Sequence, residues 1–244
     1  MKPWIFFILA ALGPVASTQA QPRGSRASGL EDVADLMGRY ATALGGYPSL
    51  RSASSALADG RFHLLERNWP MQLSWRSPNL ARMRIEQSAG TYVLLHDGEG
   101  FWRKLPWENN YIPMQPDQAL VFEQLIRLVH PVLELYEGGH EIEHLGTELF
   151  DKQEVEVLSY RLPEAGEFRV LFNSATNLPL ASVLPSNEDG SQTVVQYSDY
   201  RGVRNLQVAH RIEVRVDGWT EQVFTYDTMT LNVGILTNLF DHDN

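Results

Sequence analysis

Two histidines that flank a pair of glutamates are the first residues in this sequence whose spacing could support chemistry. His140-Glu141-Ile142-Glu143-His144 has the H-E-x-x-H pattern, in which two histidines on one helix face hold zinc and a glutamate acts as base. Only six residues separate Gly139 from Gly146, too few for such a helix. In a strand, residues four apart lie ~13 Å from each other, a gap that Zn–N bonds of ~2 Å cannot close. The pattern therefore favours a polar strand edge, and we expect no bound metal.

Other enzyme motifs are missing from the sequence. There is no G-x-S-x-G elbow, phosphate-binding loop or dinucleotide fingerprint. His210 falls on the apolar side of an alternating segment and is interpreted as a core or cavity histidine with a hydrogen-bonded partner. Asp199 is interpreted as an acceptor for turn amides, or for Arg201 or Arg204. We therefore expect no catalytic residues, no cofactor and no enzymatic activity.

Composition narrows the class of protein further. The 244 residues are 43% hydrophobic and 20% charged, which is ordinary for a globular fold. The net charge of −10 argues against nucleic acid as a partner, because a phosphate backbone needs a basic surface. The chain contains no cysteine, which excludes disulfides, thiolate catalysis and lipid attachment to an N-terminal cysteine.

The N-terminus has the pattern of a secretory signal peptide. Lys2 is followed by an apolar run from Trp4 to Leu12, then by Gly13-Pro14 and a small-x-small site at residues 18–20. A membrane anchor would need ~20 apolar residues. We expect residues 1–20 to be removed, residues 21–29 to form a flexible leader, and the mature protein to be soluble and monomeric.

The remaining pattern predicts a mainly β chain with two helical segments. Apolar residues at helical spacing predict a helix from Leu30 to Leu44, which Gly45-Gly46 ends. Five short strands follow between Gly60 and Leu105. Residues 118–136 predict a helix that Pro131 interrupts and that is apolar over more than half its circumference, as expected of a helix buried on two sides. With no composition shift that marks a boundary, we expect residues 30–244 to form a single domain.

Strands return after residue 140 and end in an antiparallel meander. Residues 208–216 alternate without a miss, with Val208, His210, Ile212, Val214 and Val216 on one side. Asp217-Gly218 supplies the turn that reverses this strand into a hairpin. The sequence thus predicts a curved sheet with one apolar face.

A series of short motifs runs along the chain in a definite order. The motifs are Ala43-Leu44-Gly45-Gly46, Leu50 and Gly60, Ser77-Pro78-Asn79 with Arg82-Met83-Arg84-Ile85-Glu86, Tyr92 to Asp97-Gly98 with Gly100-Phe101-Trp102, Pro131-Val132-Leu133, Gly139-His140, Asn177-Leu178-Pro179, and Ser198-Asp199-Tyr200-Arg201 with Arg211-Ile212-Glu213-Val214. Each motif is short, so the specificity lies in their order, which covers nearly all of the mature chain. This order resembles the LolA-like superfamily of outer-membrane lipoprotein-sorting or carrier proteins.

This resemblance implies an unclosed antiparallel β-barrel of about eleven strands, with helices packed in its concave face as a lid. It also implies a periplasmic location and a cavity that holds lipoprotein acyl chains or another lipid-like ligand, passed between membrane-associated donor and acceptor proteins. Many relatives carry a proline where this chain has His210. Arg82 and Arg84 are candidates for the carrier's functional arginine, with surface salt bridges as the alternative. The residues expected to line the cavity are Phe62, Leu64, Leu73, Trp75, Met83, Ile85, Val93, Leu95, Phe101, Leu125, Val129, Leu133 and His210.

Two alternatives to a carrier stay open at this point. The first is a ligand-free module of the same fold, whose filled core leaves only its surface to recognise an envelope protein. The second, less favoured, is a zinc hydrolase that uses His140 and His144. The sequence predicts a curved sheet with one apolar face, beside a helix that is apolar over more than half its circumference. Because no polar catalytic cluster accompanies them, this combination favours a cavity for a hydrophobic ligand.

Overall fold

The computed structural model of the chain describes residues 28–127, 131–187 and 189–242. The predicted signal peptide at residues 1–20 lies outside the described residues, as do the predicted leader up to residue 27 and Val129. Within the described ranges, no helix is both long enough and apolar enough to cross a membrane.

The strands form one antiparallel sheet that does not close, since β6 at one end and β7 at the other do not pair. This confirms the predicted unclosed barrel, with thirteen strands rather than about eleven. Their spatial order is β6-β5-β4-β3-β2-β1-β13-β12-β11-β10-β9-β8-β7. The strands are β1 (Ser55–Leu64), β2 (Arg67–Arg76), β3 (Leu80–Gln87), β4 (Gly90–Asp97), β5 (Phe101–Lys104), β6 (Ile112–Pro113), β7 (Ile142–Phe150), β8 (Gln153–Leu162), β9 (Gly166–Asn173), β10 (Pro179–Val183), β11 (Thr193–Val203), β12 (Leu206–Val216) and β13 (Trp219–Leu231).

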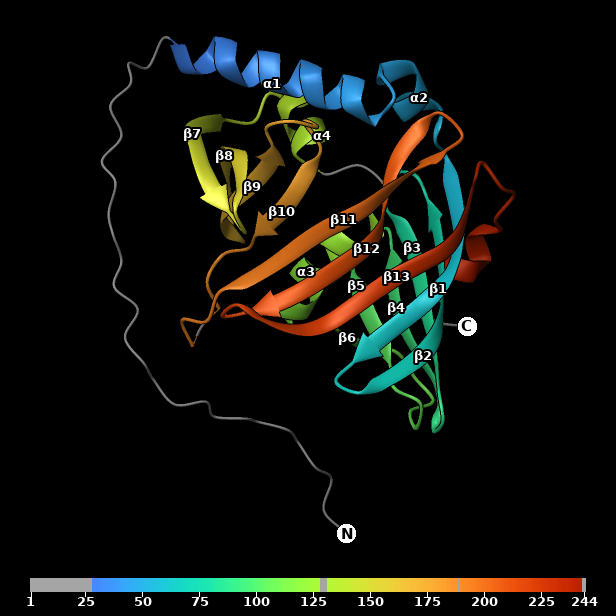
Figure 1. Cartoon of the computed structure of the whole chain (residues 1–244). Helices are drawn as coiled ribbons and strands as arrows, with labels where there is room; N and C mark the ends of the chain where they lie inside the picture. Colours follow the sequence, from blue (N-terminus) through green and yellow to red (C-terminus); the bar gives the residue numbers. More distant parts are fainter. Residues whose placement is uncertain (1–27, 128–130, 188, 243–244) are drawn as a thin grey trace.

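The α-helices cover one end of the sheet and fill its concave side. They are α1 (Ser28–Leu44), α2 (Tyr47–Ser52), α3 (Pro116–Ile126) and α4 (Val132–Glu137). A short 3-10 helix, η1 (Thr237–Phe240), follows the last strand. Figure 1 shows α1 lying across one end of the molecule, with α3 behind β11–β13, inside the curve of the sheet. The helix predicted over residues 118–136 is therefore two helices, separated near Pro131, whose ring removes a backbone donor.

The first helix is anchored to the sheet by its apolar stripe and by its last turn. Leu36, Met37 and Tyr40 are fully buried, and the Tyr40 ring packs edge-on against Phe172 of β9 at 5.1 Å between centroids. The helix ends at Gly45, whose φ is 123°. A Cβ atom at this position would lie 1.8 Å from the carbonyl oxygen of Asn205, so only glycine allows α1 to approach the β11–β12 turn so closely.

The main hydrophobic core lies between these helices and the concave face of the sheet. It joins the buried stripe of α1 to Phe122 and Leu125 of α3 and to inward side chains such as Met83 and Ile85 of β3. Directly paired residues share a face of an antiparallel sheet. Because Arg84 pairs with Val93 and Arg82 with Leu95, these four residues lie on the convex face, opposite Met83 and Ile85.

This register corrects the sequence prediction for β4. Val93 and Leu95 were expected to line the concave cavity, but the inward residues of this strand are Tyr92 and Leu94, which pack against the main core. Every residue from Tyr92 to Leu95 is apolar or aromatic, so alternation alone could not distinguish the two faces of the strand.

The C-terminal segment covers the convex face at this place. Helix η1 lies against β3 and β4, and Phe240 is buried. Beyond it, the His242 ring stacks on Trp102 at 4.1 Å between centroids, and its Nδ1 lies 2.7 Å from Asp97 Oδ2. The buried residues Val93 and Leu95 therefore belong to a clasp between the C-terminal segment and β3–β5, not to the cavity.

The contacts of Asp97 in this clasp should contribute to the stability of the fold, and we expect that contribution to be lost in acid. Burial opposes ionisation of this carboxyl, but hydrogen bonds from the Gly100 and Glu99 amides, the Trp102 indole and His242 outweigh it, so its pKa falls below the ordinary 3.8. Because the folded pKa is depressed, the contribution is present above pH 3.8 and lost as pH falls through the lower folded value. We expect Asp97→Asn to be less stable than wild type at pH 7 and the difference to shrink in acid, as followed by urea unfolding; a pH-independent difference would contradict this.

Candidate functional site

Helix α3 is the element that occupies the inside of the sheet. Pro116 lies in its first turn beside Asp117, which suits the unpaired amides and positive end of a helix N-terminus. Its buried residues are Phe122, Gln124, Leu125 and Ile126, of which only Gln124 is polar. The helix thus presents an apolar surface to the sheet, interrupted by one amide.

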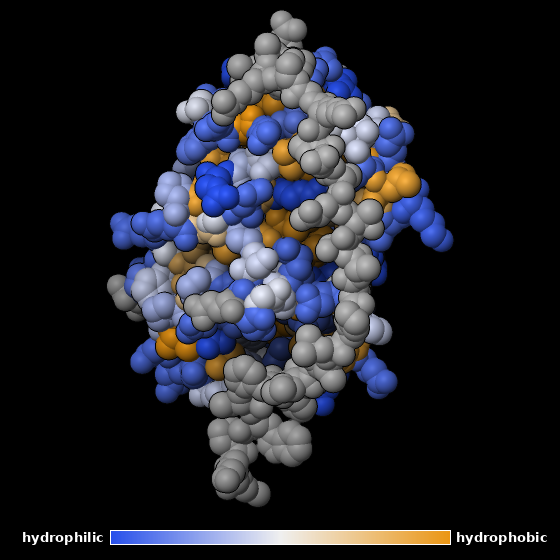
Figure 2. All heavy atoms as spheres, turned by 90° about the vertical axis from the view of Figure 1, so that its left-hand side faces the viewer, coloured by the Kyte–Doolittle hydropathy of each residue, from blue (hydrophilic) through white to orange (hydrophobic). Residues whose placement is uncertain are grey.

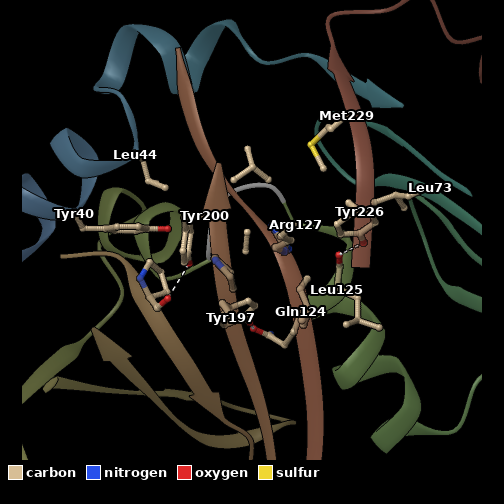
Figure 3. A pocket seen from close by; sticks show the side chains of 15 residues that line it. Tyr40, Leu44, Leu73, Gln124, Leu125, Arg127, Tyr197, Tyr200, Tyr226 and Met229 are labelled. Atoms are coloured by element: carbon tan, nitrogen blue, oxygen red, sulfur yellow. Dashed lines mark hydrogen bonds between the residues drawn. The ribbon is translucent and has the colours of Figure 1, made fainter. Parts of the chain in front are cut away.

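A small set of hydrogen bonds fastens α3 to the sheet. The Oε1 atom of Gln124 accepts from Ser182 Oγ of β10 at 3.3 Å and from Tyr197 OH of β11 at 3.2 Å. The two hydroxyl oxygens lie 3.0 Å apart. On the other side of the helix, Tyr226 OH of β13 donates to the Leu125 carbonyl at 3.4 Å. Figure 3 shows Tyr197 beside Gln124 and Tyr226 beside Leu125.

Four tyrosines from β11, β13 and α1 line the space beside α3: Tyr40, Tyr197, Tyr200 and Tyr226. Tyr200 OH donates to the Pro179 carbonyl at 2.8 Å. Burial raises the pKa of Tyr197, Tyr200 and Tyr226 well above the usual range. These side chains therefore remain neutral hydroxyls that can donate hydrogen bonds at any physiological pH.

The space between α3 and the sheet is nearly filled. The cavity lined by the tyrosines, Leu73 and Leu125 has a volume of about 30 Å³. A second hollow of about 150 Å³ lies between α3, α4 and strands β8 and β9, and shares Gln124, Arg127 and Pro131 with the first. Sites for small molecules typically measure ~300–1,000 Å³. With α3 in this position, neither space could hold an acyl chain.

The charges at the junction of the two hollows sum to one negative charge. Arg127 follows the end of α3 and forms ion pairs with Glu123 at 2.7 Å and with Glu134 of α4 at 2.8 Å. Its guanidinium is thus shared between two carboxylates, so these three side chains carry a net charge of −1 in the lining of the second hollow.

The structure brings most of the residues predicted for the cavity into one core. Nine of them belong to the main core or pack against it: Phe62, Leu64, Leu73, Trp75, Met83, Ile85, Phe101, Leu125 and Leu133. Only Leu73 and Leu125 also line the small cavity. Val93 and Leu95 lie on the convex face, and Val129 lies outside the described residues.

His210 is buried but lines neither hollow. Its Nδ1 lies 2.9 Å from the carbonyl oxygen of Val208 in the same strand, as expected of a core histidine with a hydrogen-bonded partner. Asp199 pairs with Arg201 at 3.0 Å, one of the partners expected from the sequence.

The two arginines singled out by the resemblance lie away from the cavity. Arg82 and Arg84 are on the convex face of β3. Arg84 forms an ion pair with Glu86 at 2.8 Å, which agrees with the surface alternative. The arginine that does line the cavity is Arg127, three residues after Gln124 in the chain.

The H-E-x-x-H residues do not form a helical pair. His140 precedes the strand, and His144 lies on β7, as the sequence predicted. The Nε2 atom of His144 is 2.7 Å from Glu156 of β8, and its Nδ1 is 3.9 Å from Asp32 of α1. In the described part of the chain, no three His, Asp or Glu side chains are grouped to hold a metal ion.

On the face that Figure 2 shows, the protein has less continuous apolar surface for a lipid than it has in its interior. Hydrophilic side chains dominate this face, with hydrophobic atoms in small recesses between them. Large exposed apolar residues of the described chain come from separate turns, loops and strands, and include Leu65, Trp107, Leu149 of β7 and Trp219 of β13. Scattered apolar residues are normal on soluble surfaces and do not mark a binding patch.

The polar residues beneath α3 were not predicted from the sequence. Gln124 had a visible signal, since it is a polar residue on the most apolar surface of its helix. Ser182 and Tyr197 had none, because nothing in the sequence pairs β10 and β11 with α3. The contact of Ser182 and Tyr197 with Gln124 follows only from the way the open sheet curves around α3.

Sequence comparison gives no match for this chain. No protein-family model matches it, and no curated protein matches it.

Comparison with solved structures identifies the fold. A domain from Vibrio parahaemolyticus, assigned to outer membrane lipoprotein sorting, is 13% identical with a TM-score of 0.58, over 89% of this chain and 97% of that one. A DUF1329 family protein from Desulfovibrio piger is 10% identical with a TM-score of 0.60, over 87% and 97%. A LolA superfamily protein from Nitrosomonas europaea is 14% identical with a TM-score of 0.56, over 86% and 97%. The chain therefore has the fold of LolA-superfamily structures, as its motif order indicated.

Proposed function

We propose that this chain, which has the LolA-superfamily fold, is a non-enzymatic periplasmic carrier or binding protein for lipoprotein acyl chains or another lipid-like ligand. The observation that carries the proposal is the position of α3, an apolar helix inside an unclosed sheet. We call α3 and α4 the lid. The ligand takes the place of α3 against the concave face, whose wall includes Phe62, Leu73, Met83 and Ile85.

The free energies of burial of α3 and of an acyl chain favour such an exchange. The docked helix buries Phe122, Leu125 and Ile126, each worth about 1.5–3 kcal/mol of burial. An acyl chain gains ~0.8 kcal/mol for each buried methylene, so a chain of about 15 methylenes would gain ~12 kcal/mol. By this comparison a long acyl chain can displace α3 from the sheet, whereas a short one cannot.

The closed cavity fits the empty state of such a carrier. In this state α3 shields the apolar wall from water, and the protein stays monomeric until it meets a membrane-associated donor. Transfer to an acceptor returns α3 to the sheet. Residues 1–20 direct the chain to the periplasm and are then removed.

Native mass spectrometry of the protein purified from the periplasmic fraction of a bacterial host tests the proposal. We expect a population with added mass, which organic extraction removes and identifies as an acylated lipid. The extracted protein should then take up a fluorescent monoacylglycerol. A protein that is repeatedly ligand-free and takes up no such probe would refute the carrier.

A second candidate is a ligand-free envelope module of the same fold. The observation that favours it is the small cavity of about 30 Å³, which is what a permanently filled core would show. In that case α3 is part of the core and never leaves the sheet. The two candidates differ in whether α3 can undock while the sheet stays folded.

A further inference from the structure

A buried tyrosine hydroxyl lines the second hollow without a hydrogen-bond partner among the described residues. It belongs to Tyr160 of β8, which is only 4% exposed and whose ring stacks on Phe168 of β9 at 5.1 Å between centroids. Burial raises the pKa of Tyr160, so the hydroxyl stays neutral. Buried polar groups in folded proteins are almost always hydrogen-bonded, so this hydroxyl marks a position suited to a ligand.

Two carboxylates line the same hollow, and each uses only one of its oxygens. Glu123 of α3 accepts from Arg127 through Oε1, and Glu134 of α4 accepts from Arg127 through Oε2. In the contacts of the described residues, the other oxygen of each carboxylate has no donor. The lining therefore offers three free acceptors, the Tyr160 hydroxyl included, beside a net charge of −1.

These features select the charge and the size of a ligand. The negative charge repels a carboxylate or a phosphate. A metal ion needs grouped ligands, and within the described ranges no three His, Asp or Glu side chains are so grouped. The rest of the lining includes Leu135, Leu162 and Phe168, which suit carbon atoms, and aromatic rings attract cations. An organic cation with a short carbon stem fits this lining.

We propose that the second hollow binds the primary ammonium group of a small amine. An ammonium carries three N–H donors, one for each free acceptor at Glu123, Glu134 and Tyr160. The hollow measures about 150 Å³, and a single water needs roughly 10–15 Å³ of such space. It therefore has room for a molecule of a few heavy atoms.

The proposed site is complete only while α3 is docked. Glu123 and Glu134 belong to the lid, whereas Tyr160 belongs to the sheet. A bound ammonium thus joins the lid to the sheet and stabilises the closed state. The site does not depend on the proposed carrier, because its residues are in place without an acyl ligand.

An NMR titration of the 15N-labelled protein with two molecules of similar size tests the proposal at neutral pH and constant ionic strength. They are ethanolamine and ethylene glycol, in which a hydroxyl replaces the ammonium. We expect ethanolamine to shift the amide signals of Tyr160 and Phe168 saturably, and ethylene glycol to leave them unchanged. Hydrogen exchange of the α3 amides should slow in ethanolamine.

Three variants locate the binding. Tyr160→Phe removes the hydroxyl and keeps the ring, so we expect about tenfold weaker ethanolamine binding, the value of one hydrogen bond to a charged group. Glu134→Gln removes one negative charge from a side chain that is 66% exposed and should weaken binding by about threefold, because solvent screens that charge. Tyr200→Phe is the matched control: it removes a hydroxyl from the first hollow and not from the second, and binding should not change.

The results that overturn the proposal are distinct from those that concern the carrier. Equal shifts with ethylene glycol, or unchanged binding in both Tyr160→Phe and Glu134→Gln, overturn the ammonium site. Tighter binding of phosphoethanolamine than of ethanolamine assigns the site to a lipid headgroup and overturns the free amine as its ligand. Failure of ethanolamine to bind wild type overturns the site and leaves the carrier standing, since acyl probes test the carrier.

Discussion

Leu125→Asp should release α3 from the sheet while the sheet stays folded. Leu125 is 3% exposed on the inner surface of the helix, and burial of an unpaired carboxylate there costs about 3–5 kcal/mol. Because α3 is held by apolar contacts and a few hydrogen bonds, we expect the cost to be met by undocking. Hydrogen exchange should show unprotected amides in α3 and protected strands, and binding of a hydrophobic dye should rise.

Gln118→Asp is the control, because it introduces the same side chain at an exposed position of the same helix. It should leave exchange and dye binding unchanged. If Leu125→Asp instead lowers the stability of the whole chain in one transition, with α3 protected until the strands unfold, then α3 is an inseparable part of the core. That result would favour the ligand-free module over the carrier.

Gly60→Ala should cause a large loss of global stability through a single added methyl group. Gly60 lies at an irregularity in the pairing of β1 with β13, where Asp59 faces Thr228 and Gly60 faces Tyr226. A Cβ atom at residue 60 would lie 1.9 Å from the Thr225 carbonyl oxygen. The clash is with the backbone of β13 in the middle of the sheet, not with a side chain that could rotate away. We expect a loss of about 3–5 kcal/mol in the free energy of unfolding, measured in urea.

Gly38→Ala makes the same change at a position of α1 where nothing lies within 4 Å of the new atom. It should be neutral or stabilise by about 0.5–1 kcal/mol, because alanine favours a helix. Similar stabilities for Gly60→Ala and Gly38→Ala would mean that β1 can move away from β13. That result would contradict a close packing of the Gly60 backbone against Thr225.

Periodicity was enough to predict the sheet, its apolar face and the buried helix. The unbroken alternation of residues 208–216 correctly predicts β12. The strongly apolar pattern of residues 118–136 predicts helical structure enclosed by other elements, which the structure shows as two helices, α3 and α4. Alternation failed in β4, where Tyr92 to Leu95 have no polar residue to mark the outer face. The convex side is also apolar there because the C-terminal segment covers it.

Local irregularities explain why the cavity lining could not be predicted. Asp199 adopts a positive φ of 53°, which lies outside the extended conformation of a regular strand. The pairs on either side of it, Ser198 with Arg211 and Tyr200 with Ala209, keep the same register. Both Tyr197 and Tyr200 line the cavity, although an odd spacing in a regular strand would put them on opposite faces.

The exchange of α3 for an acyl ligand is tested most directly by hydrogen exchange of the wild-type protein with and without a monoacylglycerol. If the ligand replaces the helix, amides of α3 should exchange faster when the ligand is bound, while those of β10, β11 and β13 stay equally or better protected. Slower exchange in α3 on loading, or no change anywhere, would contradict the proposal that the ligand binds where α3 now lies.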